Sequence, residues 1–237
     1  MYKLGCALTC HYRLLNSSED VEQLLMYFIK NKSIQVIEIG FYDSDSYNLF
    51  NESYLMSEAL LLAEKNKKEI NLHLLRKNWD IMGIERVVRD IKILENRIKI
   101  KYIIIHEDDY KKYAKFLIPS HSNILVENTS GLFDLKIDNI VCDINHFYSD
   151  DLFKTRDFSK FIKSNSAKIK EFHFAYKNHN IFNQRNIHWF KHRFENIRSV
   201  LPPSSVGFIF EGTDKKAESI SELITSLNLN IQLLTGV

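Results

Sequence analysis

The sequence predicts a single (β/α)8 barrel of the TIM type, an α/β fold. Short apolar runs recur about every 20 to 40 residues, and most are separated by helix-like stretches, which is the alternation typical of parallel βα units. The 237 residues also fall within the usual length of one such barrel. We therefore expect one domain over residues 1–237.

The first half of the chain is expected to form four strand and helix pairs. The expected strands cover 2–9, 34–40, 70–75 and 100–105, and the expected helices cover 21–31, 52–67, 81–97 and 109–118. Ser17 or Ser18 is expected to cap the first helix, and Pro119 is expected to stop the fourth. The apolar run YIII before His106 has the pattern of a strand that is covered on both faces.

The second half repeats this pattern with one exception. The expected strands cover 123–127, 139–143, 169–174 and 206–210, and the expected helices cover 150–164, 187–200 and 215–227. Only the short connector GLFDLKIDN follows strand 123–127, so we expect a shortened fifth helix. Thr213 or Asp214 is expected to cap the last helix. The competing open doubly wound sheet lacks support, because no glycine-rich turn follows the first strand.

Composition narrows the class of protein. Hydrophobic residues make up 45% of the chain, which allows a large core, and 3 prolines and 7 glycines argue against a linker. The net charge of +2 comes from interspersed charges, which is not typical of a nucleic-acid binder. The three cysteines contain no Cys-x-x-Cys pair, so neither a disulfide framework nor a thiolate zinc site is indicated. No run of about 18 apolar residues occurs, so we expect no membrane segment and a cytoplasmic location.

Acidic and histidine residues follow seven of the expected strands. Asp and Glu number 30 and His numbers 9, so about one position in six carries such a side chain. Their repeated occurrence at strand ends is therefore unlikely to arise by chance. The residues at these ends are Glu38, His73, His106, Glu127, Asp143 with His146, His173 and Glu211.

The parallel barrel brings these ends to one mouth, because all strands point the same way. We expect Glu127, Asp143, His173 and Glu211 to face each other there. Three carboxylates and one imidazole suit Mn²⁺, Mg²⁺ or Co²⁺, and Zn²⁺ becomes possible if more histidines join. Two alternatives stay open: His73 or His106 could be a hydrogen-bonded core histidine, and Glu38 could pair with a lysine inside the barrel.

These residues resemble the superfamily of xylose isomerase-like barrels, which includes sugar and sugar phosphate isomerases and epimerases and the endonuclease IV group. The resemblance covers nearly the whole chain. It depends on VEN at 126–128, on D-x-x-H from Asp143 to His146, on His173 and on Glu211.

The isomerase and epimerase branch implies one divalent metal ion held by residues matching Glu127, Asp143, His173 and Glu211. The two glutamates would also be catalytic, one removing and the other returning a proton next to the sugar carbonyl. His146 resembles a residue that contacts the substrate. This branch implies a small-molecule carbohydrate substrate and a possible homo-oligomer.

The endonuclease IV branch implies a longer ligand list and three zinc ions. The additional matches are His73, His106, His146 and His188. The chain departs from this branch at Asn186, where an aspartate is expected, and IHWF at 187–190 also resembles a helix start of the isomerases, in which His188 would cap the helix. Long basic insertions that would bind a DNA backbone are missing, so a nucleic-acid partner is not expected.

The first hypothesis is therefore a metal-dependent isomerase or epimerase of a sugar, a sugar phosphate or a related polyol-derived compound. The second is an endonuclease IV-like phosphodiesterase or phosphatase with two or three zinc ions. A third is a barrel without catalytic activity that serves as a binding subunit. Glu38, His73, His106, His146 and His188 remain candidates for substrate binding or for additional metal ligands.

Overall fold

A computed structural model describes most of the chain at the level of individual residues. The described residues are 2–40, 54–74, 83–119, 121, 123–128, 137–144, 158–176, 180–199 and 206–235. Residues 131–136 of the connector GLFDLKIDN (131–139), on which the shortened fifth helix was expected, and His146 lie outside them.

Eight parallel strands close into one barrel in sequence order, so the predicted fold is confirmed. The strands are β1 (Lys3–Ala7), β2 (Val36–Gly40), β3 (Glu69–Leu74), β4 (Ile100–His106), β5 (Ile124–Glu127), β6 (Ile140–Asp143), β7 (Ile169–Phe174) and β8 (Gly207–Phe210). Strand β8 pairs with β1, and this pairing removes both sheet edges.

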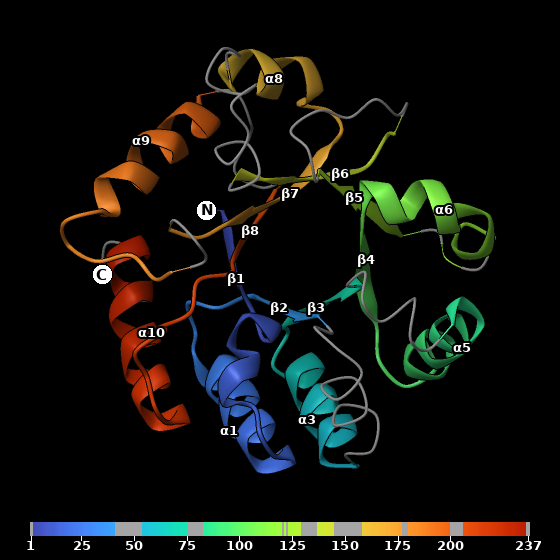
Figure 1. Cartoon of the computed structure of the whole chain (residues 1–237), viewed down its shortest axis with the longest axis horizontal. Helices are drawn as coiled ribbons and strands as arrows, with labels where there is room; N and C mark the ends of the chain where they lie inside the picture. Colours follow the sequence, from blue (N-terminus) through green and yellow to red (C-terminus); the bar gives the residue numbers. More distant parts are fainter. Residues whose placement is uncertain are drawn as a thin grey trace.

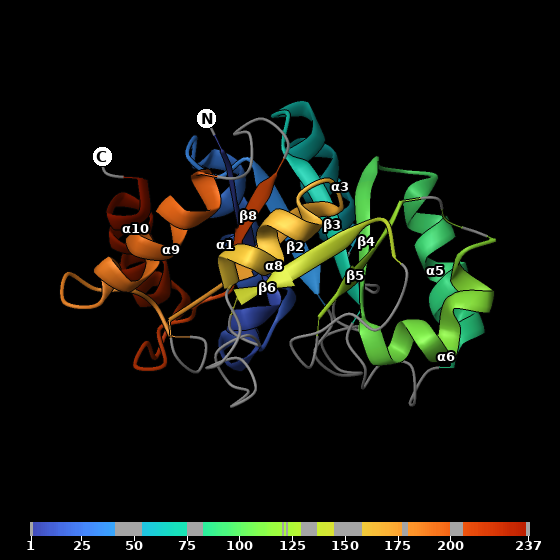
Figure 2. The ribbon, with the colours of Figure 1, turned by 90° about the horizontal axis from the view of Figure 1, so that it is seen from above.

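Helices surround the strands on the outside of the barrel (Figure 1). They are α1 (Ser18–Lys30), α3 (Tyr54–Lys65), α5 (Ile84–Glu95), α6 (Glu107–Leu117), α8 (Phe158–Asn165), α9 (Ile187–Arg198) and α10 (Ile220–Thr235). Figure 2 shows α5 and α6 at one side of the barrel and α9 and α10 at the opposite side. Within the described ranges, no helix has both the length and the apolar character that crossing a lipid bilayer requires.

The capping residues explain where two of these helices begin. Ser17 caps α1, because its hydroxyl accepts the N–H of Asp20 and the Asp20 carboxylate accepts the N–H of Ser17. Helix α10 begins at Ile220 rather than near 215, because Asp214 accepts the N–H of Lys216 and closes a separate turn first. A short 3-10 helix at Thr9–Leu14 was not predicted.

Strand side chains alternate between the helices and the barrel interior. Phe172, Phe174 and Phe208 belong to the core under the helices. The interior contains two small apolar clusters instead, formed by Ala7, Val36 and Ile209 and by Ile104, Leu125 and Val141. These clusters are part of the packed layer below the C-terminal mouth, which also contains the buried polar side chains of Asn71 and Glu171.

The opposite end of the barrel carries an ion-pair network. Glu69 at the start of β3 binds both Lys3 on β1 and Lys101 on β4 through its two carboxylate oxygens. These three residues join strands that are not all neighbours in the sheet. Charged residues at the N-terminal end of a TIM barrel usually serve stability rather than chemistry.

Candidate metal centre

Five strands deliver histidine and glutamate side chains to the C-terminal mouth. Register sets their depth, because His106 on β4 pairs with Glu127 on β5, and Asp143 on β6 pairs with His173 on β7. His173 is fully buried, and His106, with 20% of its side chain exposed, is the most open of the group. The site is therefore enclosed by the barrel and reached from the mouth.

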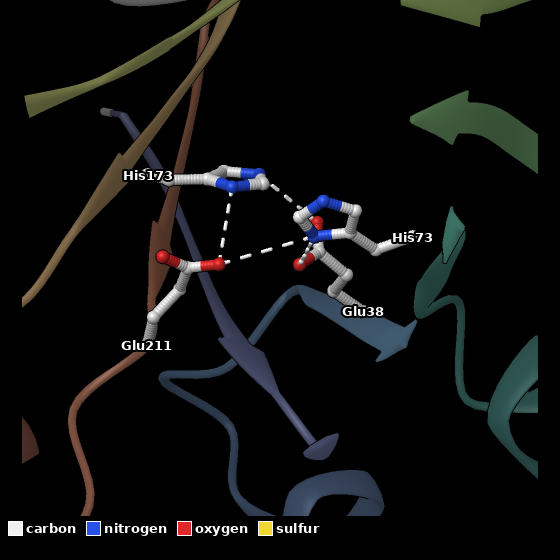
Figure 3. A group of neighbouring side chains, drawn as sticks. All are labelled: Glu38, His73, His173 and Glu211. Atoms are coloured by element: carbon white, nitrogen blue, oxygen red, sulfur yellow. Dashed lines mark hydrogen bonds and ion pairs between the residues drawn. The ribbon is translucent and has the colours of Figure 1, made fainter. Parts of the chain in front are cut away.

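Two overlapping groups of these side chains have the arrangement of metal ligands. We call Glu38, His73, His173 and Glu211 the four-residue cluster, and His73, His106 and Glu127 the three-residue cluster. In each, one ligand atom from every member lies within 4.8 Å of the others. Figure 3 shows the four-residue cluster, with side chains from β2, β3, β7 and the end of β8 pointing toward one another.

In the four-residue cluster each histidine contacts two glutamates. Nδ1 of His173 lies 3.2 Å from Oε1 of Glu211, and Nε2 of His173 lies 3.0 Å from Oε2 of Glu38. Nδ1 of His73 lies 3.2 Å from Oε1 of Glu38 and 3.9 Å from Oε1 of Glu211. Glu38 therefore has two histidine partners in place of the lysine that was the alternative.

The ligand atoms of the three-residue cluster form a compact triangle with sides of 2.8 to 3.5 Å. Nε2 of His73 lies 2.8 Å from Oε2 of Glu127 and 3.3 Å from Nε2 of His106, and the third side, from His106 to Glu127, is 3.5 Å. A tetrahedral Zn²⁺ with bonds of about 2.0–2.1 Å holds its ligand atoms roughly 3.3 Å apart. These three atoms could therefore bind one such ion with little rearrangement.

Among the described residues, three atoms of the site are buried without a hydrogen bond. They are Oε2 of Glu38, Oε2 of Glu127 and Nδ1 of His173. Buried polar atoms in native proteins are usually hydrogen-bonded, and a metal ion is one explanation when they are not. The donor set and these three atoms fit a divalent cation.

Opposite charges perturb the ionisation of the site strongly. Burial alone lowers the pKa of His73, but the Glu127 and Glu38 carboxylates outweigh burial and raise this pKa to about 10. Burial likewise opposes the charged form of His173, yet Glu38, Glu211 and Glu127 raise its pKa well above the ordinary value. Without a metal ion, the surrounding carboxylates therefore favour the protonated, cationic form of both imidazoles.

The glutamates show the reverse effect. Burial raises the pKa of Glu38, but the charges of His173 and His73 outweigh it and lower the pKa to about 2. The same two histidines hold the pKa of Glu127 well below its usual range, against the effect of burial. Both groups are carboxylates at neutral pH, the form that metal binding and proton abstraction require.

Three of the four expected metal ligands, Glu127, His173 and Glu211, meet around the Nδ1 atom of His173. Nδ1 of His173 lies 3.5 Å from Oε1 of Glu127 and 3.2 Å from Oε1 of Glu211. Asp143 is buried nearby but belongs to neither cluster of the described residues. Its backbone is clamped by Asn128, whose side chain accepts the N–H of Asp143 at 2.7 Å and donates to its carbonyl at 3.2 Å.

Of the candidates for substrate binding or additional metal ligands, some join the two clusters and one does not. Glu38, His73 and His106 join the clusters, so the contacts of the two histidines exceed those of ordinary core histidines. His188 is exposed in the first turn of α9 and belongs to neither cluster, and the cap position of that helix is Asn186. Metal binding by any of these residues, including Asp143 and His188, stays a prediction.

Sequence reasoning missed two polar side chains inside the barrel. Glu171 on β7 and Asn71 on β3 are both buried, and Asn71 donates from Nδ2 to Oε2 of Glu171 at 2.8 Å. Burial raises the pKa of Glu171, although the hydrogen bond with His173 opposes this shift. Each residue precedes a site histidine by two positions, so strand alternation could have indicated them.

Solved structures share this architecture. A sugar phosphate isomerase/epimerase from Parabacteroides distasonis superposes with a TM-score of 0.58 at 12% identity, covering 100% of this chain and 94% of that one. D-psicose 3-epimerase from Clostridium cellulolyticum, solved with D-tagatose, gives 0.62 at 10% identity, covering 99% and 97%. A D-psicose 3-epimerase solved in the presence of D-fructose gives 0.57 at 11%, covering 99% and 97%.

The chain therefore has the same closed (β/α)8 barrel fold as these proteins. No protein-family model and no curated protein sequence matches it. At 10 to 12% identity these likenesses concern the fold. One barrel fold can host different reactions, so the function must be argued from the side chains of the mouth.

Proposed function

We propose that the protein is a divalent-metal-dependent isomerase or epimerase that acts on a sugar, a sugar phosphate or a related polyol-derived compound. The observation that carries this proposal is the position of two glutamates beside one buried imidazole. Glu127 and Glu211 approach Nδ1 of His173 to 3.5 and 3.2 Å. The fold shared with proteins described as sugar epimerases supports the same substrate class.

The chemistry follows from what these side chains can do. His173 and Glu211 would hold the cation together with Glu38 or His73, and Glu127 reaches the same nitrogen of His173 from β5. When bound, a divalent cation there would polarise a substrate carbonyl and acidify the neighbouring C–H bond. Glu127 is ionised, so it can accept a proton from that carbon, and Glu211 would return a proton to the product.

Metal analysis and isotope exchange test this proposal. We expect about one Mn, Mg or Co per chain, and deuterium incorporation from solvent next to the carbonyl of a ketose. The probes are D-fructose, D-psicose, D-tagatose and ketose phosphates. Glu211→Gln should abolish the exchange, whereas Glu69→Gln, at the other end of the barrel, should not alter it. Metal-loaded protein that exchanges no deuterium with any probe would contradict the proposal.

The three-residue cluster supports a second candidate, a zinc-dependent phosphodiesterase or phosphatase. His73, His106 and Glu127 form a His₂Glu set that a reaction with one metal ion does not need. This candidate predicts two or three Zn per chain and hydrolysis of bis-nitrophenyl phosphate. His106→Ala should then remove one zinc and the hydrolysis together. If His106→Ala leaves the metal content and the ketose exchange unchanged, the first candidate stands alone.

A further inference from the structure

A buried carboxylate lies directly beneath the proposed metal centre. Glu171 is only 2% exposed and precedes His173 by two residues on β7, so both side chains face the barrel interior. Burying a carboxylate costs free energy unless it is hydrogen-bonded. Because the proposed chemistry does not use Glu171, its position needs another explanation.

The hydrogen bonding of His173 provides this explanation. Nε2 of His173 lies 3.2 Å from Oε1 of Glu171, in good hydrogen-bond geometry. Oε2 of Glu38 lies 3.0 Å from the same nitrogen as an ion-pair partner, but this oxygen has no hydrogen bond among the described residues. The Nε2–H therefore points at Glu171, and Nδ1 is left facing Glu211 and Glu127.

Glu171 is itself held by a residue across the barrel and given room by one on the neighbouring strand β8. Asn71 on β3 donates to Oε2 of Glu171 at 2.8 Å across the barrel interior. On the other side, β8 carries Gly207, where a Cβ atom would approach the same oxygen to 3.2 Å. The glycine leaves room for the carboxylate, and the amide fixes which oxygen faces His173.

We propose that Glu171, anchored by Asn71, is a positioning residue that holds His173 with Nδ1 toward the cation. Metal-binding histidines usually donate their other N–H to such an acceptor, which fixes the tautomer and the ring orientation. The inference rests on the proposed metal centre, not on the reaction that occurs there.

The affinity for Mn²⁺ and Zn²⁺, measured by calorimetry, tests the role of Glu171. Glu171→Gln keeps an oxygen that can accept the Nε2–H, and rotation of the Asn71 amide can satisfy the new NH₂ group. We expect its affinity to stay within about threefold of wild type. Glu171→Met has similar length but no acceptor, and it should weaken binding by about 10- to 100-fold.

A second readout follows His173 directly. In the zinc-loaded protein, ¹⁵N NMR of the imidazole should show the metal on Nδ1 and the proton on Nε2. Glu171→Met should broaden or divide this signal, and Glu171→Gln should keep it. A purely structural role predicts the opposite pattern, a lower stability of the metal-free Met variant with an unchanged metal affinity and NMR signal.

The outcomes separate this inference from the proposed reaction. Equal metal affinity of wild type and a folded Glu171→Met variant would overturn the positioning role and leave the isomerase proposal intact. If the Met variant does not fold, Asn71→Ala gives the same comparison, with an expected loss of about 3- to 10-fold because the carboxylate loses its anchor. Wild-type protein that binds metal as expected but exchanges no deuterium would reject the reaction alone. Wild-type protein that binds neither metal would reject both.

Discussion

Raising the pH should destabilise the metal-free protein, because its site is neutralised by protonated imidazoles. The pKa of His73 is about 10 in the folded chain, against an ordinary value of 6.5 in the unfolded chain. A group whose pKa is higher in the folded chain stabilises the fold fully at pH values below its unfolded pKa. This stabilisation is lost as the pH rises toward its folded pKa. The loss therefore begins near pH 6.5 and continues toward pH 10.

The magnitude follows from proton linkage. If an imidazole keeps its proton in the folded chain while the unfolded chain loses it, the unfolding free energy falls by roughly 1–2 kcal/mol between pH 6.5 and 8. The side chains of His73 and His173 are 6% and 0% exposed, so solvent screening is small. If both keep their protons, the metal-free protein should lose about 3 kcal/mol over this interval. Glu38, with a pKa of about 2, adds nothing there, because its contribution is lost only in acid.

Metal binding should reverse this dependence of stability on pH. Cations bind neutral imidazole, so binding releases the protons of His73 and His173 and becomes tighter as the pH rises. At a fixed excess of Mn²⁺ or Zn²⁺, the stabilisation by the metal ion should therefore grow from pH 6.5 to 8.

Urea denaturation with and without EDTA, repeated between pH 6.5 and 8, measures how the stability of the metal-free and of the metal-bound protein depends on pH. His73→Gln removes one of the two imidazoles, and it should remove about half of the pH dependence of the metal-free protein. Burial raises the pKa of the Cys6 thiol to about 12. At higher pH this thiol would also lower the stability of the folded chain, because it ionises in the unfolded chain first. The measurement therefore stops at pH 8. A metal-free stability that stays constant or increases between pH 6.5 and 8 would refute the assignment of cationic imidazoles.

Two further substitutions test the packing that supports the site. Gly5→Ala should destabilise the barrel by about 3 kcal/mol in urea denaturation, because a Cβ atom there would lie 2.4 Å from Cδ1 of Ile209 and 2.9 Å from the carbonyl oxygen of Val36. An unchanged urea midpoint would show that the barrel interior accommodates the methyl group. Asn128→Ala should lower the free energy of unfolding by about 2–3 kcal/mol, because it removes both hydrogen bonds between the Asn128 side chain and the backbone of Asp143. Hydrogen exchange at the Asp143 amide should accelerate. An amide that stays protected would contradict this role.

The order and nature of most elements followed from the sequence alone. Runs such as VIEIG and YIIIH are apolar along their length because both strand faces are covered, which makes them visible without any tertiary information. Capping by Ser17 or Ser18 was readable because it depends on residues that are close in the chain. The start of the last helix was misplaced by about five residues, since Asp214 closes a turn instead of capping α10.

Local chemistry in the sequence thus determined a closed parallel barrel with acidic and histidine side chains at its mouth. The tertiary structure alone decided which of these side chains meet. Glu38 and His73 join the site and His188 does not, because strand register and ring orientation depend on contacts between residues far apart in the chain. The same holds for Glu171 and Asn71, 100 positions apart, whose pairing exists only because the barrel closes.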